Sequence, residues 1–271
     1  MPFRDSGSDA ELAMAAALAG AEVVREMFGA PLERHDKGRG DFATDADLAS
    51  EAAVLEVLRY ARPDDAVLGE ETGRIGESES ERMWLVDPLC GTANYAAGHL
   101  MVAVNVALRE GTDIVAAASA DPSTGEVYWT DGANPLVRRG HVIRALRPSA
   151  RTGLVDVNLE SPYPTIGLDH GSALLADSVF TERFRPRVVS TTLAVAFVAA
   201  GKRAGYITDG EMRDNVHFSA GVALCLAAGC TVTDLRGEQL SSEAAGLIAA
   251  ADEETHAALL DVIARQAEAG V

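Results

Sequence analysis

Two acidic residues stand at the ends of short apolar segments, where a carboxylate can be held rigidly. Glu70 follows the apolar segment 66–69, and Asp87 follows the apolar segment 83–86. Hard divalent cations such as Mg²⁺ prefer carboxylate and carbonyl oxygens, and they use few protein ligands when a substrate phosphate completes the shell. Two acids at the ends of predicted strands are therefore a candidate site for a hard metal ion.

The residues that follow Asp87 are typical of a helix start. The chain continues from Asp87 as Pro-Leu-Cys-Gly-Thr, so that Gly91 and Thr92 stand at the expected first turn. The backbone N–H groups of a first turn have no partner within the helix, and the helix dipole favours an anion there. Gly91 and Thr92 are therefore candidate ligands of a phosphate group.

These motifs resemble the inositol monophosphatase family of metal-dependent phosphatases. The matching segments are Asp-Phe-Ala-Thr-Asp-Ala-Asp at 41–47, Gly-Glu-Glu at 69–71, the stretch 83–95 and Val-His-Phe-Ser-Ala-Gly at 216–221. The resemblance spans residues 9–237, with the motifs in family order. It implies that Glu70, Asp87 and the backbone carbonyl of Leu89 hold a magnesium ion.

The same resemblance assigns roles to other residues. It implies that Asp47 and Thr92 orient the attacking water and that Lys37 and Asp41 belong to a loop that helps complete the site. The C-terminal match at 187–192 implies a second domain and places Ser190 and Thr191 among the substrate-binding residues. Substrate-selecting groups of the family precede His217, in a stretch that here contains Asp209, Glu211, Arg213 and Asp214.

Two positions depart from the family pattern. Cys90 and His217 stand where the family has aspartates that hold a second metal together with Asp87. One possibility is a single hard metal. Removing two carboxylates removes two negative charges, which offsets the two positive charges lost with one divalent ion. Another is a softer ion such as Zn²⁺ on Cys90, His217 and Asp87, since thiolate and imidazole suit zinc. A third is that His217 acts as a proton carrier or fixed cation, without a second metal or without any metal.

The resemblance favours hydrolysis of a small phosphate monoester, such as a sugar, cyclitol or nucleotide phosphate, at a one-metal or altered-metal site. Two alternatives stay open because the second metal site is eroded. The protein could be a biosynthetic lyase or cyclase that eliminates or displaces phosphate or sulfate. It could also be a non-catalytic ligand-binding or partner subunit.

Composition narrows the class of partner. The 271 residues carry 41 acidic and 23 basic side chains, a formal net charge of -18, which opposes binding to nucleic acid or to an anionic membrane. No apolar run approaches the roughly 20 residues of a membrane helix, and no signal peptide is evident, so we expect a cytoplasmic protein. Three cysteines do not form a disulfide framework. We expect a small anionic metabolite as ligand, and the resemblance suggests a homodimer.

The elements that must position these residues alternate between helix and strand. Helices are predicted at 9–28, 45–60, within 91–98, and at 171–180, 192–201, 215–229 and 252–266. Strands are predicted at 66–68, 84–86, 155–159 and 187–190, with an antiparallel meander over 101–109, 114–120 and 126–130. Residues 31–40 and 72–82 are expected to be loops.

This pattern predicts layers of sheet and helix, and the resemblance implies an α/β fold, a layered αβαβα sandwich of the inositol monophosphatase type. An N-terminal α+β domain, residues 1–147, would carry the metal and phosphate motifs. A C-terminal α/β domain, residues 148–271, would complete the pocket.

Overall fold

A computed structural model describes residues 7–38, 40–77, 80–159, 170–212, 215–240 and 245–269. The chain forms two compact units. The first unit comprises Met1–Ala145, Thr191–Leu193 and Val216–Leu224, and the second comprises Leu146–Ser190, Ala194–Asn215 and Cys225–Val271. Two short segments of the C-terminal half therefore belong to the first unit, and they carry Thr191, Thr192 and His217. The predicted domain ranges 1–147 and 148–271 stay a prediction.

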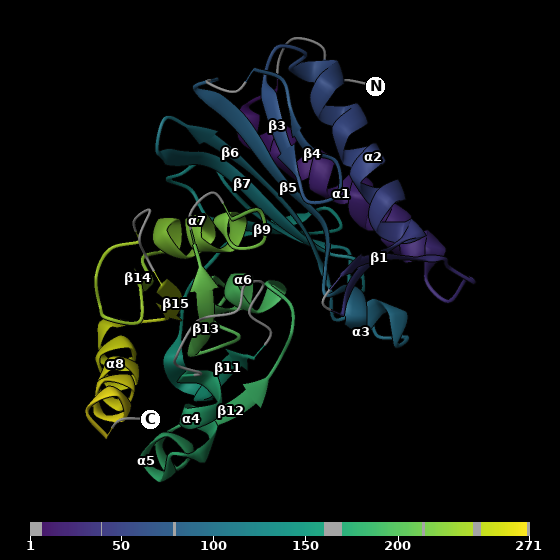
Figure 1. The fold of residues 1–271 in the computed structure, drawn as a ribbon. Coiled ribbons are helices and arrows are strands. Elements are labelled where there is room, and N and C mark those ends of the chain that lie inside the picture. The colour runs from purple at the N-terminus through teal and green to yellow at the C-terminus, as the bar shows by residue number, and fades with distance from the viewer. Residues whose placement is uncertain are drawn as a thin grey trace. The chain divides into compact units, whose positions relative to one another are not determined.

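The first unit is built on an eight-stranded sheet with the order β10-β9-β8-β7-β6-β5-β3-β4 (Figure 1). Only the β3–β5 pair is parallel among these neighbours. The strands are β3 (Ala66–Gly69), β4 (Gly73–Ile75), β5 (Arg82–Cys90), β6 (Ala103–Glu110), β7 (Asp113–Asp121), β8 (Glu126–Thr130), β9 (Leu136–Arg139) and β10 (Val142–Ala145). The predicted meander at β6, β7 and β8 is confirmed.

Both faces of the sheet are covered in the region of β5. Trp84 and Val86 point into a core cluster with α1 (Asp9–Met27) and α2 (Asp45–Ala61). Met83 and Leu85 point into another cluster that includes Ala220 and Ala223 of α7 (Ser219–Ala228). A strand buried on both faces needs apolar residues at successive positions, which explains the continuous apolar run before Asp87.

The helices α1 and α2 lie side by side on one face of this sheet (Figure 1). Helix α1 begins at Ser8, whose side chain and the Glu11 side chain form a capping box. Gly20 allows close approach of the two helices, because a Cβ there would lie 2.7 Å from Ser50 Oγ and 2.8 Å from Val54 Cγ2. Both predicted helices are confirmed to within a residue at each end.

Residues 31–40 were expected to be a loop, and this was wrong. The segment contains β1 (Arg34–Gly38), which pairs antiparallel with β2 (Asp41–Thr44). Strand β1 is exposed along its whole length and is held by its backbone hydrogen bonds to β2. Because neither face of β1 is buried, its sequence lacks the apolar alternation that would have predicted a strand. Strand β4 likewise lies inside the predicted loop 72–82, of which residues 78–79 are outside the described part.

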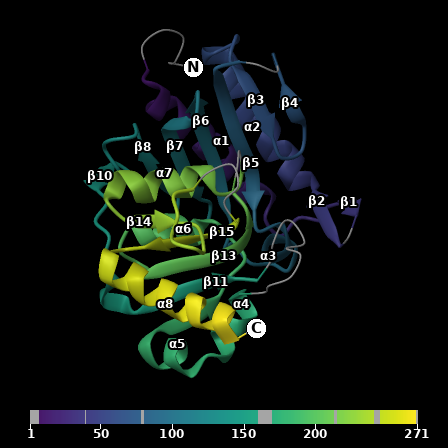
Figure 2. The ribbon, with the colours of Figure 1, turned by 60° about the vertical axis from the view of Figure 1, so that its left-hand side comes forward.

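The second unit contains a five-stranded sheet with the order β12-β11-β13-β15-β14. Its strands are β11 (Leu154–Asn158), β12 (Arg185–Val188), β13 (Gly205–Glu211), β14 (Thr231–Thr233) and β15 (Ala245–Ala250). Helix α8 (Glu253–Ala269) runs along this sheet (Figure 2), and its Leu259, Val262 and Ile263 pack with the sheet core. Strands β13, β14 and β15 were missed from the sequence.

The remaining helices are short. They are α3 (Thr92–Ala96), the 3-10 turn η1 (Ala150–Thr152), α4 (His170–Ala176), α5 (Ser178–Arg183) and α6 (Leu193–Ala199). The predicted single helix at 171–180 is two helices, because the Asp177 side chain accepts N–H groups of Val179 and Phe180 and so starts α5. The predicted α/β sandwich fold is confirmed.

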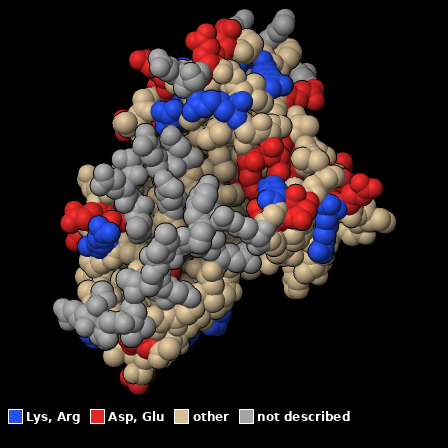
Figure 3. All heavy atoms as spheres, viewed as in Figure 1, with Lys and Arg blue, Asp and Glu red and all other residues tan. Residues whose placement is uncertain are grey.

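On the face shown in Figure 3, the acidic patches are interrupted by Lys and Arg side chains. Among the described residues, no helix combines the length and the apolar character that crossing a bilayer requires.

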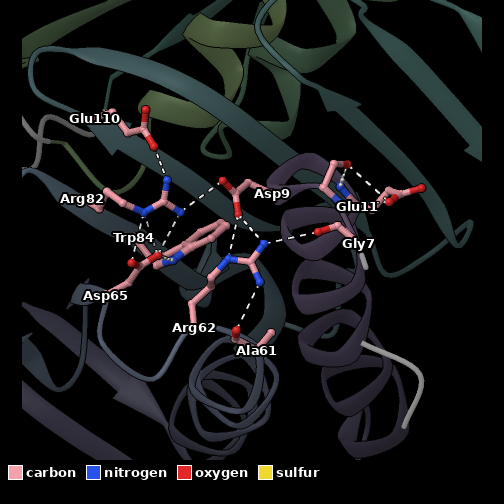
Figure 4. Close-up of polar contacts among 10 residues, drawn as sticks. Gly7, Asp9, Glu11, Ala61, Arg62, Asp65, Arg82, Trp84 and Glu110 are labelled. Carbon is pink, nitrogen blue, oxygen red and sulfur yellow. Dashed lines mark hydrogen bonds and ion pairs between the residues drawn. The ribbon is translucent and has the colours of Figure 1, made fainter. Parts of the chain in front are cut away.

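A cluster of charges ties the start of α1 to the end of α2 and the start of β5 (Figure 4). The Arg82 guanidinium contacts Asp65 at 3.1 Å, Asp9 at 3.1 Å and the Glu110 carboxylate. Arg62 donates to Asp9, and the Trp84 indole N–H donates to Asp65 at 2.9 Å. The acidic neighbours raise the pKa of Arg82 above its ordinary value, Asp65 being the main cause.

Replacing Arg82 with methionine is expected to lower the free energy of unfolding by about 1–2 kcal/mol, because several partly buried carboxylates lose their shared donor. The measurement is urea denaturation of the variant beside Arg59→Met, a change of an exposed arginine on α2. Equal losses in the two variants would show that the cluster does not stabilise the fold.

Candidate active site

Asp87 and Cys90 stand on the two sides of an irregularity in β5. The register between β5 and β6 shifts between Asp87 and Cys90. Pro88 lies inside this interruption and has no N–H to donate to a ladder, which is where a strand tolerates proline. The shift ends the regular strand directly before Gly91, whose φ of 107° lies in the left-handed region that glycine adopts without strain. Pro88 and Gly91 therefore determine the backbone path from Asp87 to the start of α3.

Asp87 is fully buried and its carboxylate is surrounded by donors. Its Oδ1 accepts the Leu89 N–H at 3.2 Å, and its Oδ2 accepts the Asn105 side-chain amide at 3.4 Å. The His217 Nδ1 atom lies 2.8 Å from Oδ2. These contacts hold the carboxylate in one orientation.

Asp47 and Thr92, predicted to orient the attacking water, are hydrogen-bonded to each other, and their role stays a prediction. The Thr92 hydroxyl lies 2.8 Å from Asp47 Oδ1 and 3.2 Å from the Leu89 carbonyl. Asp47 Oδ2 accepts the N–H of Thr44 at 2.7 Å and its hydroxyl at 2.6 Å. Burial is the main cause that raises the pKa of Asp47 above its ordinary value, against the hydrogen bonds that lower it. A buried carboxylate with a raised pKa is a better proton acceptor than an ordinary aspartate.

Glu70 has one satisfied and one unsatisfied oxygen. Lys37 of β1 places its Nζ 2.9 Å from Glu70 Oε1 and 2.7 Å from Glu71 Oε1. Glu70 Oε2 is buried and has no hydrogen-bond partner among the described residues. Burial, with the charge of Asp87, raises the pKa of Glu70 to about 8. An unpartnered buried carboxylate oxygen beside a second acid is a fit place for a cation, and hard oxygen ligands suit magnesium.

Lys37 is matched to this acidic setting. Burial would lower the pKa of the Lys37 ammonium, but the neighbouring Glu70 and Glu71 carboxylates outweigh burial and hold the pKa above its ordinary value. The lysine therefore stays charged and balances part of the negative charge. The carboxylate of Asp41, which was predicted to lie in the same loop, accepts a hydrogen bond from the Phe42 N–H.

Glu51 fixes the segment that carries Glu70. The Glu51 carboxylate, buried on α2, accepts the N–H groups of Glu71 at 2.8 Å and Thr72 at 2.9 Å as well as the Thr72 hydroxyl. Glu51 is four residues beyond Asp47, so both side chains lie on the same face of α2. One helix face therefore holds both the Asp47–Thr92 pair and the turn after β3.

Replacing Glu51 with glutamine is expected to weaken the binding of a divalent cation at Glu70 about 10-fold, because the amide NH₂ meets backbone donors and the turn carrying Glu70 shifts. The measurement is the dissociation constant for magnesium by isothermal titration calorimetry, compared with Glu56→Gln on the exposed side of α2. Unchanged magnesium affinity of a folded Glu51→Gln protein would show that the turn is held by other contacts.

Cys90 and His217 lie beside Asp87, as expected from the family positions that they occupy. The group Asp87, Cys90 and His217 has its possible ligand atoms within 4.8 Å of one another. His217 stands in the turn before α7, not inside a helix as expected from the sequence. Burial would lower the pKa of His217, but the Asp87 carboxylate outweighs burial and raises the pKa well above its ordinary value. Burial is also the main cause that raises the pKa of the Cys90 thiol.

The predicted substrate-binding residues differ in their surroundings. The hydroxyl of Thr191, a residue of the first unit, donates to the Cys90 carbonyl at 3.2 Å and accepts the Leu193 N–H. Ser190 belongs to the second unit. Asp209, also of that unit, lies 2.7 Å from His170 Nδ1, whereas Arg213 and Asp214 lie outside the described residues. Substrate binding by Gly91, Thr92, Ser190 and Thr191 stays a prediction.

Three residues near the site were missed from the sequence. They are Glu51, Asn105 and Thr192. Asn105 could have been noticed as a polar residue at a buried strand position, between Val104 and Val106. Glu51 could have been noticed from its helical spacing to Asp47. Thr192 has no such signal, because its contact with Asn105 at 2.8 Å joins residues 87 positions apart.

The sequence pattern of the inositol monophosphatase family matches residues 7–268. The chain belongs to the inositol monophosphatase family. The resemblance seen in the motifs is thereby confirmed, and metal dependence is a property of the family.

Relatives and solved structures of the family cover most of the chain. An inositol-1-monophosphatase of Mesorhizobium japonicum is 33% identical over 206 residues, 75% of this chain and 76% of the relative. A Streptomyces griseus protein named glucose-1-phosphate thymidylyltransferase is 35% identical over 240 residues, 86% of this chain and 88% of the relative. The extragenic suppressor protein suhB of Bartonella henselae has a TM-score of 0.79 at 25% identity, over 93% of this chain and 97% of that one.

Proposed function

We propose that this inositol monophosphatase homologue hydrolyses a small phosphate monoester in the presence of a divalent cation. The observation that carries the proposal is the partly buried Asp47–Thr92 contact of 2.8 Å, made from the same α2 face that anchors the Glu70 turn. The relatives include an inositol-1-monophosphatase and a protein named for glucose 1-phosphate, which supports a sugar or cyclitol phosphate as the substrate class.

Each site residue has a role in this proposal. Glu70, Asp87 and the Leu89 carbonyl would hold magnesium, which supplies positive charge to the phosphate oxygens. Asp47 accepts a proton from water through or beside the Thr92 hydroxyl, because its carboxylate is buried and basic. Backbone N–H groups at the start of α3 orient the phosphate, and Lys37 balances the charge of Glu70 and Glu71.

The proposal is tested with the purified full chain and a set of sugar, cyclitol and nucleotide phosphates. Inorganic phosphate is measured with magnesium, with zinc and with a chelator. We expect release from at least one sugar or cyclitol phosphate that stops when the cation is removed. Release that is equal with and without the chelator would contradict the magnesium-site part of the proposal.

A second candidate is elimination or displacement of phosphate by the same pocket. The observation that favours it is the 2.8 Å contact of His217 Nδ1 with Asp87, which puts an ionisable imidazole where the family holds a metal. Such a reaction yields an organic product that lacks the elements of water, whereas hydrolysis yields the alcohol. Mass spectrometry of the product separates the two.

A further inference from the structure

We propose that Asp87, Cys90 and His217 form a binding site for a soft or borderline divalent cation of the zinc type. This inference deepens the proposed function and rests on it for its catalytic meaning, since Asp87 serves both. It concerns which ion the eroded position accepts.

The donor set selects the ion. A thiolate, an imidazole and a carboxylate are the three side chains that zinc takes most often, whereas magnesium binds thiolate and imidazole poorly. The possible ligand atoms of Asp87, Cys90 and His217 lie within 4.8 Å of one another. Three protein ligands also leave one place of a tetrahedron for water or a substrate oxygen.

The three ligands are each held by further contacts. The Thr192 N–H donates to Cys90 Sγ at 3.2 Å, which holds the sulfur in place. Asn105 donates to Asp87 Oδ2 and to the Thr192 hydroxyl, so that one amide links the carboxylate to the residue that contacts the thiol. Second contacts of this kind orient ligands in metal sites.

His217 completes the group from a different part of the sequence. Its Nδ1 lies 2.8 Å from Asp87 Oδ2, and its possible ligand atom lies within 4.8 Å of the Cys90 sulfur. A cation would replace the contact between His217 and Asp87. Because the ion binds thiolate and neutral imidazole, binding releases the Cys90 thiol proton and one His217 ring proton to solvent and forms metal–sulfur and metal–nitrogen bonds.

The site is tested with cobalt(II), which takes zinc positions and absorbs light when bound to a thiolate. Cobalt is added to the full chain without substrate, and zinc is then added as competitor. We expect a cobalt–thiolate charge-transfer band that zinc abolishes. The band should persist in Cys230→Ala, because that buried cysteine lies outside the group, and disappear in Cys90→Ala and in Cys90→Ser.

Several outcomes would overturn the proposal. They are the absence of the band in the folded wild-type protein, its persistence in both Cys90 variants, and its loss in Cys230→Ala alone. Circular dichroism verifies that each variant is folded, and Cys90→Ser preserves the side-chain volume if Cys90→Ala is unstable. In His217→Ala, cobalt affinity should fall by about 100-fold. An intact cobalt band without phosphate release would reject the proposed function but not the metal site.

Discussion

Replacing Asp87 with asparagine is expected to lower kcat/KM for phosphate release by roughly 1,000-fold or more, since the metal site loses a charged ligand. Asp87 is buried and its two oxygens contact Leu89, Asn105 and His217, so the amide also meets at least one donor with an NH₂ group. The loss should be seen at every magnesium concentration.

The measurement is steady-state release of inorganic phosphate by Asp87→Asn and by Asp64→Asn, an exposed aspartate before β3. Thermal unfolding of both variants verifies that the fold is kept. A folded Asp87→Asn enzyme with the wild-type rate would remove Asp87 from the metal site.

Replacing Asp47 with asparagine should lower kcat by about 10² to 10⁴-fold, the usual range for a general base. Asp47 receives hydrogen bonds from Thr44 and Thr92, so its loss removes both the proton acceptor and the partner of the Thr92 hydroxyl. KM for the phosphate ester should change little, because Asp47 is not proposed to contact it.

The comparison variant for Asp47 is Asp45→Asn, two residues earlier on the same helix start. Asp45 is an exposed acid that contacts His35 and the Glu33 N–H. Equal kcat values for Asp47→Asn and the wild type would show that water is activated by another group. A rise of KM without a fall of kcat would assign Asp47 to substrate binding.

Much of the first unit could be predicted because its elements carry local signals. The helix of residues 45–60 has Asp47 in its first turn, and β5 has an apolar run because both faces of its sheet are covered. The strands of the meander have alternating or continuous apolar residues, and turn residues separate them. These signals lie within short windows of the chain, so residue spacing suffices.

Other parts depend on partners that are distant in sequence. Strand β1 is exposed throughout and exists through pairing with β2. The Glu51 contacts join residues 20 and 21 positions apart, and the Asn105–Thr192 contact spans 87 positions. Such contacts leave no local pattern in the sequence. The proximity of His217 to Asp87 could therefore be predicted only from the family resemblance.

The measurement that tests the central claim most directly is phosphate release in water labelled with oxygen-18. Hydrolysis with water attack at phosphorus predicts one labelled oxygen in the inorganic phosphate and none in the organic product. Elimination or displacement of the whole phosphate group predicts unlabelled phosphate. Labelled phosphate whose formation stops without the cation supports the account, and unlabelled phosphate from an active enzyme contradicts it.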